Sequence, residues 1–265
     1  MRVGRFLVSW NSLLQSLKHP SLWRCLLTGG GYAEVFKLHV NLELSNAVKV
    51  LKRIAITNVD PYNLPLNVSR MRNEFIRQNC FGSSYLYGVV RLLKPSVVVE
   101  TGVYHGVSTT FILAAMQDND HGELWSVDLP NQEYQVSSSS RTTSVSEHLP
   151  PGSSTGFVVP EEFRRRWHLE LGDSREVLPR LLTRLETVDL FVHDSEHTYD
   201  TMTYEFGVAW PHLRNGGLLL SDDVGWNASF EDFAKDVGAP FAISRGQAGG
   251  PFAVRREQAG MLVKV

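Results

Sequence analysis

The chain has 265 residues, of which 43% are hydrophobic and 20% are charged, and 26 Lys and Arg against 28 Asp and Glu give a formal net charge of −2. These are globular proportions, and they exclude disorder over most of the chain. The near-neutral charge gives no general attraction to phosphate, so we expect no nucleic acid among the partners. Two cysteines, Cys25 and Cys80, exclude a disulfide scaffold and suit a cytoplasmic protein with reduced thiols. No apolar run reaches the roughly 18 residues of a spanning helix.

The first part of the chain differs in composition from the rest. Residues 1–60 carry eight basic and three acidic side chains. Within residues 1–27, apolar side chains recur at helical spacing beside basic ones, and interrupting polar residues argue against a secretory signal. We therefore expect a helical extension over residues 1–80. Its apolar face either packs against the main domain or a second subunit, as in a homo-oligomer, or makes peripheral contact with an anionic membrane.

From residue 81 the pattern changes to alternating strands and helices. Short buried runs predict strands at 97–100, 124–128, 169–171, 188–192 and 218–220. Helical patterns lie at 86–93, 108–116, 174–185, 198–213 and 228–237. Repeated strand–helix units require a mostly parallel sheet. Two closing strands, 241–244 and 252–255, have only a glycine-rich turn between them and must be antiparallel. The sequence thus predicts an α/β domain over residues 81–265 with a seven-stranded sheet.

One segment of this domain fits neither pattern. Residues 129–163 contain four consecutive serines and the run Pro150-Pro151-Gly152, with few recurring apolar positions. Such a segment is too long for an ordinary connection between a strand and a helix. It leaves the carboxyl end of the second predicted strand, where folds of this class bind ligands. We therefore expect a lid insertion here.

The first predicted strand ends in a glycine-rich turn that opens a helix. The spacing from Glu100 through Gly102 to Gly106 is Glu-x-Gly-x-x-x-Gly, with Tyr104 inside the turn and Ser108 just after it. Gly102 permits a sharp turn, Gly106 permits close backbone approach, and the helix N-terminus attracts an anion. The spacing is wider than the dinucleotide pattern Gly-x-Gly-x-x-Gly. It therefore argues against a dehydrogenase and favours a smaller anion, such as an amino-acid carboxylate.

Acidic residues also follow the second and third predicted strands. Asp128 ends the second strand, where a carboxylate can accept hydrogen bonds from both hydroxyls of a ribose. The alternative for Asp128 is a helix cap or a surface acid. Asp173 can contact an adenine amino group, and it is also well placed to cap the following helix, so it can hold both roles.

Three further carboxylates follow the fourth and fifth strands. Asp194 comes at the end of the fourth, and Asp222 and Asp223 at the end of the fifth. Adjacent parallel strands lie about 4.8 Å apart, so these side chains can meet at one edge of the sheet. Crowded carboxylates repel one another unless a cation is present, and oxygen ligands suit Mg²⁺, with Mn²⁺ or Ca²⁺ as alternatives. The competing interpretation is that these residues cap the helices that follow.

His197 lies three residues after Asp194 and points into the same site if the turn between them enters a helix. A neutral imidazole there can take a proton from a substrate hydroxyl at neutral pH. We therefore take His197 and Asp194 as the candidate catalytic residues. The competing interpretation is a histidine with a structural role.

Residues 82–256 resemble the class I S-adenosylmethionine-dependent methyltransferases. The pattern Glu100-x-Gly102-x-x-x-Gly106 matches the family's first motif, Asp128 matches its ribose-binding acid, and the reversed closing hairpin fits its Rossmann-like fold. The resemblance implies S-adenosyl-L-methionine as cofactor. The expected cofactor-binding residues are Glu100, Gly102, Tyr104, Gly106, Ser108, Asp128 and Asp173.

Within that class, Asp194-x-x-His197 followed by Asp222-Asp223 is similar to the metal-dependent O-methyltransferases. The similarity is closest to the macrocin and mycinamicin sugar O-methyltransferases and more distant to the catechol type, where a lysine stands in place of His197. It implies Mg²⁺ or Mn²⁺ held by the three aspartates, and His197 as the base. The acceptor is then a hydroxyl of a sugar or other vicinal diol, in natural-product or glycan biosynthesis.

Two alternatives remain open from the sequence. The same fold can methylate nitrogen, carbon or a carboxylate without a metal, with the aspartates in structural roles. The chain can also be a non-catalytic binding protein attached peripherally to a membrane through residues 1–27.

Overall fold

The computed structural model describes residues 86–130, 149, 154–243 and 259–265. The predicted extension over residues 1–80, with its membrane or subunit contacts, lies outside these residues, as does most of the predicted lid over 129–163. The chain divides into two compact units. All seven strands belong to the second unit, whose described residues lie within 96–106, 123–157 and 167–265.

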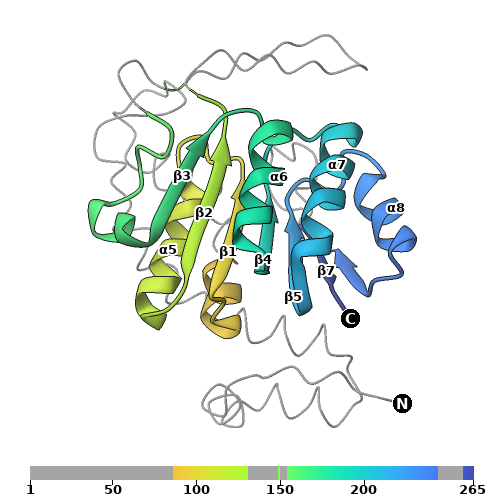
Figure 1. Cartoon of the computed structure of the whole chain (residues 1–265), viewed down its shortest axis with the longest axis horizontal. Coiled ribbons are helices and arrows are strands. Elements are labelled where there is room, and N and C mark those ends of the chain that lie inside the picture. Colours follow the sequence, from red (N-terminus) through yellow and green to blue (C-terminus); the bar gives the residue numbers. More distant parts are fainter. Residues whose placement is uncertain (1–85, 131–148, 150–153, 244–258) are drawn as a thin grey trace, which may run out of the picture. The chain divides into compact units, whose positions relative to one another are not determined.

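A mixed sheet of seven strands, in the order β3-β2-β1-β4-β5-β7-β6, forms the second unit (Figure 1). Strands β1 to β5 pair in parallel, and β7 is antiparallel to both β5 and β6. The strands are β1 (Val97–Thr101), β2 (Glu123–Asp128), β3 (Trp167–Leu171), β4 (Val188–His193), β5 (Leu213–Ser221), β6 (Phe241–Ile243) and β7 (Gly260–Val263). The predicted mostly parallel sheet with an antiparallel final pair is confirmed.

The position of the last strand differs from the prediction. The segment 252–255 lies outside the described residues, and the strand that pairs with β5 and β6 is β7 at Gly260–Val263. The connection from β6 to β7 is therefore longer than the predicted turn. Leu262 is fully buried in this register. Gly260 is required there, because a Cβ atom would lie 2.4 Å from the ring of Phe230.

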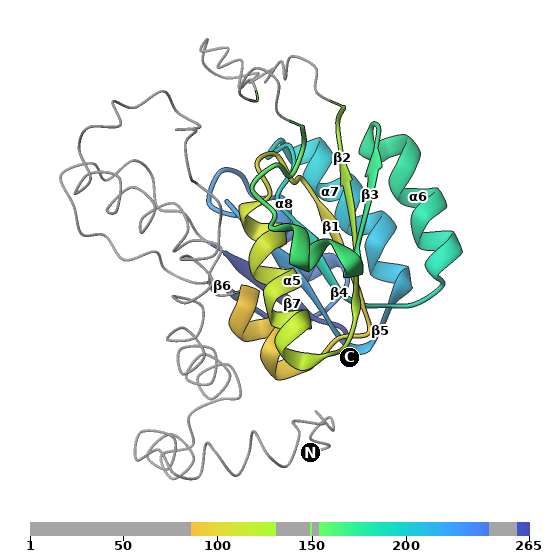
Figure 2. The ribbon, with the colours of Figure 1, turned by 90° about the vertical axis from the view of Figure 1, so that its left-hand side faces the viewer.

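Three helices of the second unit lie side by side over one face of the sheet (Figures 1 and 2). They are α6 (Ser174–Leu185), α7 (Tyr199–Ala209) and α8 (Ser229–Asp236). The amphipathic helix α6 turns Val177, Leu178, Leu181 and Leu182 into the core. Phe191, Phe206 and Phe230 are also fully buried in the same apolar cluster. Burial of one such side chain contributes about 1.5–3 kcal/mol, so this layer holds the strand ends firmly in place.

The first unit contributes two described helices and a short 3-10 turn. A helix over residues 86–93 lies beside α5 (Val107–Asn119). The Tyr87 hydroxyl of the first helix donates a hydrogen bond to Asp118 of α5 at 2.5 Å. The turn η1 (Glu161–Arg166) is tied to the same unit, since Arg166 pairs with Asp120 at 2.6 Å. None of the helices in the described part of the chain is long and apolar enough to cross a membrane.

The register of the sheet aligns the carboxyl ends of its central strands. Thr101 of β1 is paired with Val127 of β2 and with His193 of β4, and His193 is paired with Ser221 of β5. The residues that follow these four positions therefore stand in one row at the same edge. They are Gly102, Asp128, Asp194 and Asp222.

Candidate active site

Main-chain hydrogen bonds continue across that row beyond the strands themselves. The N–H of Gly102 donates to Val127 O at 2.9 Å, and the N–H of Asp194 donates to Thr101 O at 2.8 Å. The N–H of Asp222 donates to His193 O at 3.0 Å. The glycine turn and the carboxylates, which were predicted at separate strand ends, thus lie together at one edge of the sheet.

The glycine turn after β1 lies directly against the end of β4. Gly102 has a φ of +84°, and a Cβ atom on it would lie 2.0 Å from the carbonyl oxygen of Asp194. Only glycine fits a backbone position with both this φ and this close approach. Gly106 also has a positive φ of 94°, and Tyr104 has a φ of 49°. The predicted use of Gly102 in a sharp turn is confirmed, with the backbone of Asp194 as its neighbour.

Asp128 holds this turn together through its carboxylate. Its Oδ2 accepts hydrogen bonds from the N–H groups of Val103 at 3.0 Å and Tyr104 at 2.7 Å, and its Oδ1 accepts from the N–H of Leu129 at 2.7 Å. The side chain is only 7% exposed. The position of Asp128 at the strand end agrees with the prediction, whereas these main-chain partners were not predicted. Ribose binding by Asp128 stays a prediction.

The other predicted cofactor residues have well-defined places. Glu100 is fully buried, and its Oε2 accepts a hydrogen bond from the Ser126 hydroxyl at 2.8 Å. Asp173 caps α6, accepting from the N–H of Arg175 at 2.8 Å, which confirms the predicted cap. Ser108 lies in the first turn of α5, in the first unit, and is buried. Contact of these three residues with the cofactor stays a prediction.

Asp194 and Asp222 influence each other electrostatically. Burial, followed by the charge of Asp222 and then by other nearby carboxylates, raises the pKa of Asp194 well above its usual range. Burial also raises the pKa of Asp222, although the hydrogen bond from the Asp223 N–H and the charge of His193 lower it. Burial is the main cause of both pKa shifts, and the neighbouring negative charges add to the shift of Asp194.

The three predicted metal ligands do not stand in a preformed cluster. Among the residues that the structure describes, no three His, Cys, Asp or Glu side chains are grouped so as to hold a metal ion. Asp223 has a φ of 50°, and its N–H donates to Asp222 Oδ1 at 3.0 Å. The turn after β5 thus uses one oxygen of Asp222 to fix its own backbone.

His197 stands in the turn between β4 and α7, close to Asp194. Its Nε2 lies 3.9 Å from Asp194 Oδ1, and Thr198, the next residue, caps α7 by accepting the N–H of Thr201. Burial, with a further contribution from His193, lowers the pKa of His197 to about 3. The side chain is therefore neutral at pH 7, the form that accepts a proton. This proximity to Asp194 agrees with the predicted common site.

A loop after β5 completes the surroundings of His197. The Asn227 side-chain amide donates to His197 O at 3.1 Å. The ring of Trp226 has its centroid 5.6 Å from that of His197 and is 55% exposed. An exposed tryptophan beside a candidate base is a suitable surface for a ring-shaped ligand.

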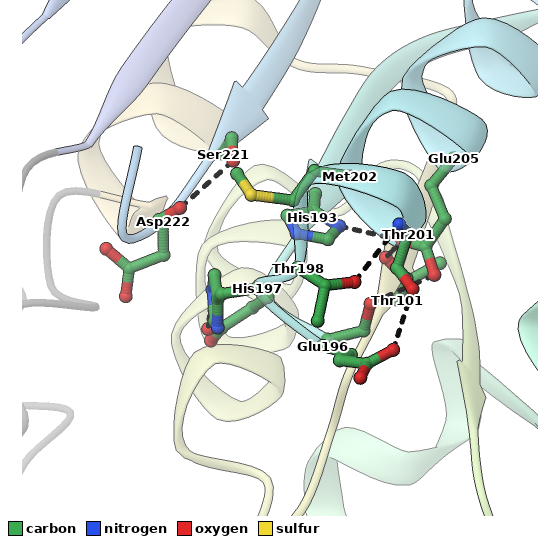
Figure 3. A network of polar contacts seen from close by, with 12 residues as sticks. Thr101, His193, Glu196, His197, Thr198, Thr201, Met202, Glu205, Ser221 and Asp222 are labelled. Atoms are coloured by element: carbon green, nitrogen blue, oxygen red, sulfur yellow. Dashed lines mark hydrogen bonds and ion pairs between the residues drawn. The ribbon is translucent and has the colours of Figure 1, made fainter. Parts of the chain in front are cut away.

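A buried polar network that was not predicted from the sequence lies next to this turn (Figure 3). Glu205 of α7 and His193 of β4 are both fully buried, with Glu205 Oε2 at 2.7 Å from His193 Nδ1. Burial alone raises the pKa of Glu205, but the His193 charge and hydrogen bonds from His193, Thr101 and Ser174 outweigh it and lower the pKa. A glutamate at a core position of a helical pattern, between Met202 and Phe206, is the signal that identifies such a network.

Comparison with known proteins agrees with this geometry. Residues 99–224 match the family model described as a methyltransferase domain. No curated protein matches the chain. This match agrees with the resemblance of the sequence to the class I methyltransferases that use S-adenosylmethionine.

Solved structures share this fold at low sequence identity. CalS11, a calicheamicin methyltransferase, is 18% identical with a TM-score of 0.50, over 83% of this chain and 92% of its own. The O-methyltransferase TomG from Streptomyces achromogenes is 17% identical with a TM-score of 0.48, over 86% and 96%. An O-methyltransferase from Bacillus cereus, in complex with SAH, is 13% identical with a TM-score of 0.46, over 83% and 90%. At 18% identity, the likeness to CalS11 concerns the fold alone.

Proposed function

We propose that the protein is an O-methyltransferase that moves the methyl group of S-adenosylmethionine to a hydroxyl of a sugar or other vicinal diol, with a divalent cation. The observation that carries this proposal is the row of Gly102, Asp128, Asp194 and Asp222 at one edge of the sheet, with His197 beside Asp194. At this edge of the sheet, a glycine turn suited to the cofactor lies beside carboxylates and an imidazole suited to a hydroxyl acceptor.

The glycine turn and its surroundings suit the cofactor. Asp128 already orders the N–H groups of this turn, so the free-energy cost of ordering the backbone when a ligand binds is small. Asp128 is the group proposed to bind the ribose, and Glu100, Tyr104, Gly106 and Asp173 of the same unit are further proposed cofactor-binding residues. This assignment follows the family's first motif rather than any observed contact.

The carboxylates at the ends of β4 and β5 fit a hard divalent cation by their chemistry. Asp194 and Asp222 repel each other, and that repulsion is what a cation relieves. We propose that Asp194 and Asp222 hold Mg²⁺ or Mn²⁺, with Asp223 as the third ligand after a small rearrangement of its turn. A bound divalent cation makes a coordinated hydroxyl more acidic.

His197 is the proposed base for the acceptor hydroxyl. Its low pKa keeps it neutral, and a base this weak accepts a proton from an alcohol only when the hydroxyl is itself made more acidic. A cation held by Asp194 would supply that acidity, and the spacing of His197 and Asp194 permits both to serve the same hydroxyl. Trp226 provides an exposed apolar surface for the remainder of the acceptor.

The proposal is tested by methyl transfer from labelled S-adenosylmethionine to catechol and simple glycosides, with Mg²⁺ and with a chelator. We expect transfer to oxygen that requires Mg²⁺ and is lost in Asp222→Asn. The matched control is Asp200→Asn, which changes an exposed aspartate of α7 and leaves transfer unchanged. Transfer to an amine, carbon or carboxylate acceptor that survives chelation contradicts the proposal and supports the metal-independent alternative.

A further inference from the structure

Glu205 is a buried carboxylate that the proposed chemistry does not use. Helix α7 places it, like Met202 and Phe206, on the face that packs into the core, and its side chain is fully buried. Burial of a carboxylate costs several kcal/mol, and an apolar side chain of similar volume often gives a protein equal or greater stability. Core packing alone is therefore a poor explanation for a glutamate at this position.

The carboxylate of Glu205 gathers the ends of two neighbouring strands. Its Oε2 accepts hydrogen bonds from His193 Nδ1 at 2.7 Å and Thr101 Oγ1 at 2.5 Å, and its Oε1 accepts from Ser195 Oγ at 2.9 Å (Figure 3). His193 and Ser195 flank Asp194 in the sequence, and Thr101 directly precedes the glycine turn. One side chain of α7 thus fixes the residues on both sides of Asp194.

This arrangement fixes the chain on both sides of Asp194. His193 precedes Asp194, Ser195 follows it, and the side chains of both are hydrogen-bonded to Glu205. The main chain of Asp194 is held in addition by its own hydrogen bond to Thr101 O. Nε2 of His193 has no hydrogen-bond partner in the described part of the chain, so Glu205 is the polar group that orients this ring.

We infer that Glu205 is a positioning residue, which acts through His193 and Ser195 to hold Asp194 in the direction needed for cation binding. The inference rests on the proposed function, because it takes Asp194 as a ligand of the cation. Outer partners that orient a metal ligand typically change metal affinity about 10–100-fold when they are removed.

The test measures Mn²⁺ binding to the full chain by electron paramagnetic resonance, which needs neither acceptor nor turnover. Glu205→Gln keeps the volume and replaces one accepting oxygen by an NH₂ group. We expect it to weaken Mn²⁺ binding about 10–100-fold. Ser195→Ala removes the hydrogen bond to Glu205 Oε1 and is expected to weaken binding about tenfold, while Ser195→Thr keeps the hydroxyl and restores binding.

Two matched controls separate positioning from general damage. Glu176→Gln makes the same change at an exposed glutamate of α6. Thr203→Val removes from α7 a buried hydroxyl that has no hydrogen-bond partner within the described residues. Both are expected to bind Mn²⁺ as the wild type does, and urea unfolding of each variant reports whether its fold is intact. If Glu205→Gln does not fold, the Ser195 pair decides the question.

Each outcome bears on a different claim. Wild-type Mn²⁺ affinity in folded Glu205→Gln and in Ser195→Ala overturns the positioning role and leaves the proposed function standing. Failure of Ser195→Thr to restore binding also overturns it, because the hydroxyl would then not be the active feature. A wild-type protein that binds no Mn²⁺ contradicts the proposed cation site, and this inference fails with it.

Discussion

Replacement of Asp128 by Asn tests whether this residue organises the glycine turn or serves only the cofactor. Both carboxylate oxygens accept main-chain N–H groups, Oδ2 from Val103 and Tyr104 and Oδ1 from Leu129. An asparagine has one accepting oxygen, so in either orientation its NH₂ group faces a donor. The better orientation keeps the two turn N–H groups and loses the bond to Leu129.

The magnitude follows from these contacts. Loss of one hydrogen bond to a charged group costs about 1.5–3 kcal/mol, and each remaining bond weakens by roughly 1 kcal/mol when its acceptor becomes neutral. We therefore expect Asp128→Asn to lower the free energy of unfolding by about 3.5–5 kcal/mol.

The assay is urea unfolding without cofactor, followed by calorimetric titration with S-adenosylhomocysteine. The control is Asp173→Asn, because aspartate and asparagine cap helices about equally well and its stability should change by less than about 0.5 kcal/mol. An unchanged free energy of unfolding in Asp128→Asn, with only the cofactor affinity reduced, would refute the reasoning.

Three further predictions follow from the same region. Gly102→Ala puts a Cβ atom 2.0 Å from Asp194 O at a φ of +84°. We expect urea unfolding to show a free energy of unfolding lower by about 2–5 kcal/mol, and we expect S-adenosylhomocysteine binding to be lost. Retained binding would contradict the contact. The pKa of His197 is about 3 in the folded state and roughly 6.5 in the unfolded state, so its contribution to stability is complete above pH 6.5 and is lost as the pH falls. Between pH 7 and pH 5, the free energy of unfolding of the wild type should therefore fall by about 2 kcal/mol more than that of His197→Gln. Equal losses in the two proteins would disprove the lowered pKa. Trp226→Ala should raise the acceptor KM about 3–10-fold without changing S-adenosylhomocysteine affinity in calorimetry, and an unchanged KM would remove Trp226 from the acceptor site.

The central sheet could be predicted from the sequence because each buried strand is a short apolar run that ends in a chemically distinctive residue. Gly102, Asp128, Asp194 and Asp222 all follow such runs, and parallel pairing alone brings them to one edge. Strand β7 was not predicted, because the apolar run near residue 252 and the one at β7 look alike. Burial of Leu262 and the contact of Gly260 with a ring, which decide between them, depend on tertiary packing.

The polar partners behind the site could not be predicted from strand ends. Asp128 accepts hydrogen bonds from N–H groups of a turn in which Tyr104 adopts a φ of 49°. Glu205 lies on a helix far along the chain from Thr101, and only the packing of α7 on the sheet brings the two together. In both cases the residue type was visible in the sequence, but its partner depended on three-dimensional geometry.

The most direct test of the account is calorimetric titration of the full chain with S-adenosylmethionine and S-adenosylhomocysteine. We predict that both bind to the wild type and that binding is lost in Gly102→Ala, because the glycine turn is the proposed cofactor site. Absence of binding for both ligands in the folded wild-type protein would contradict the assignment of the chain as a methyltransferase that uses this cofactor.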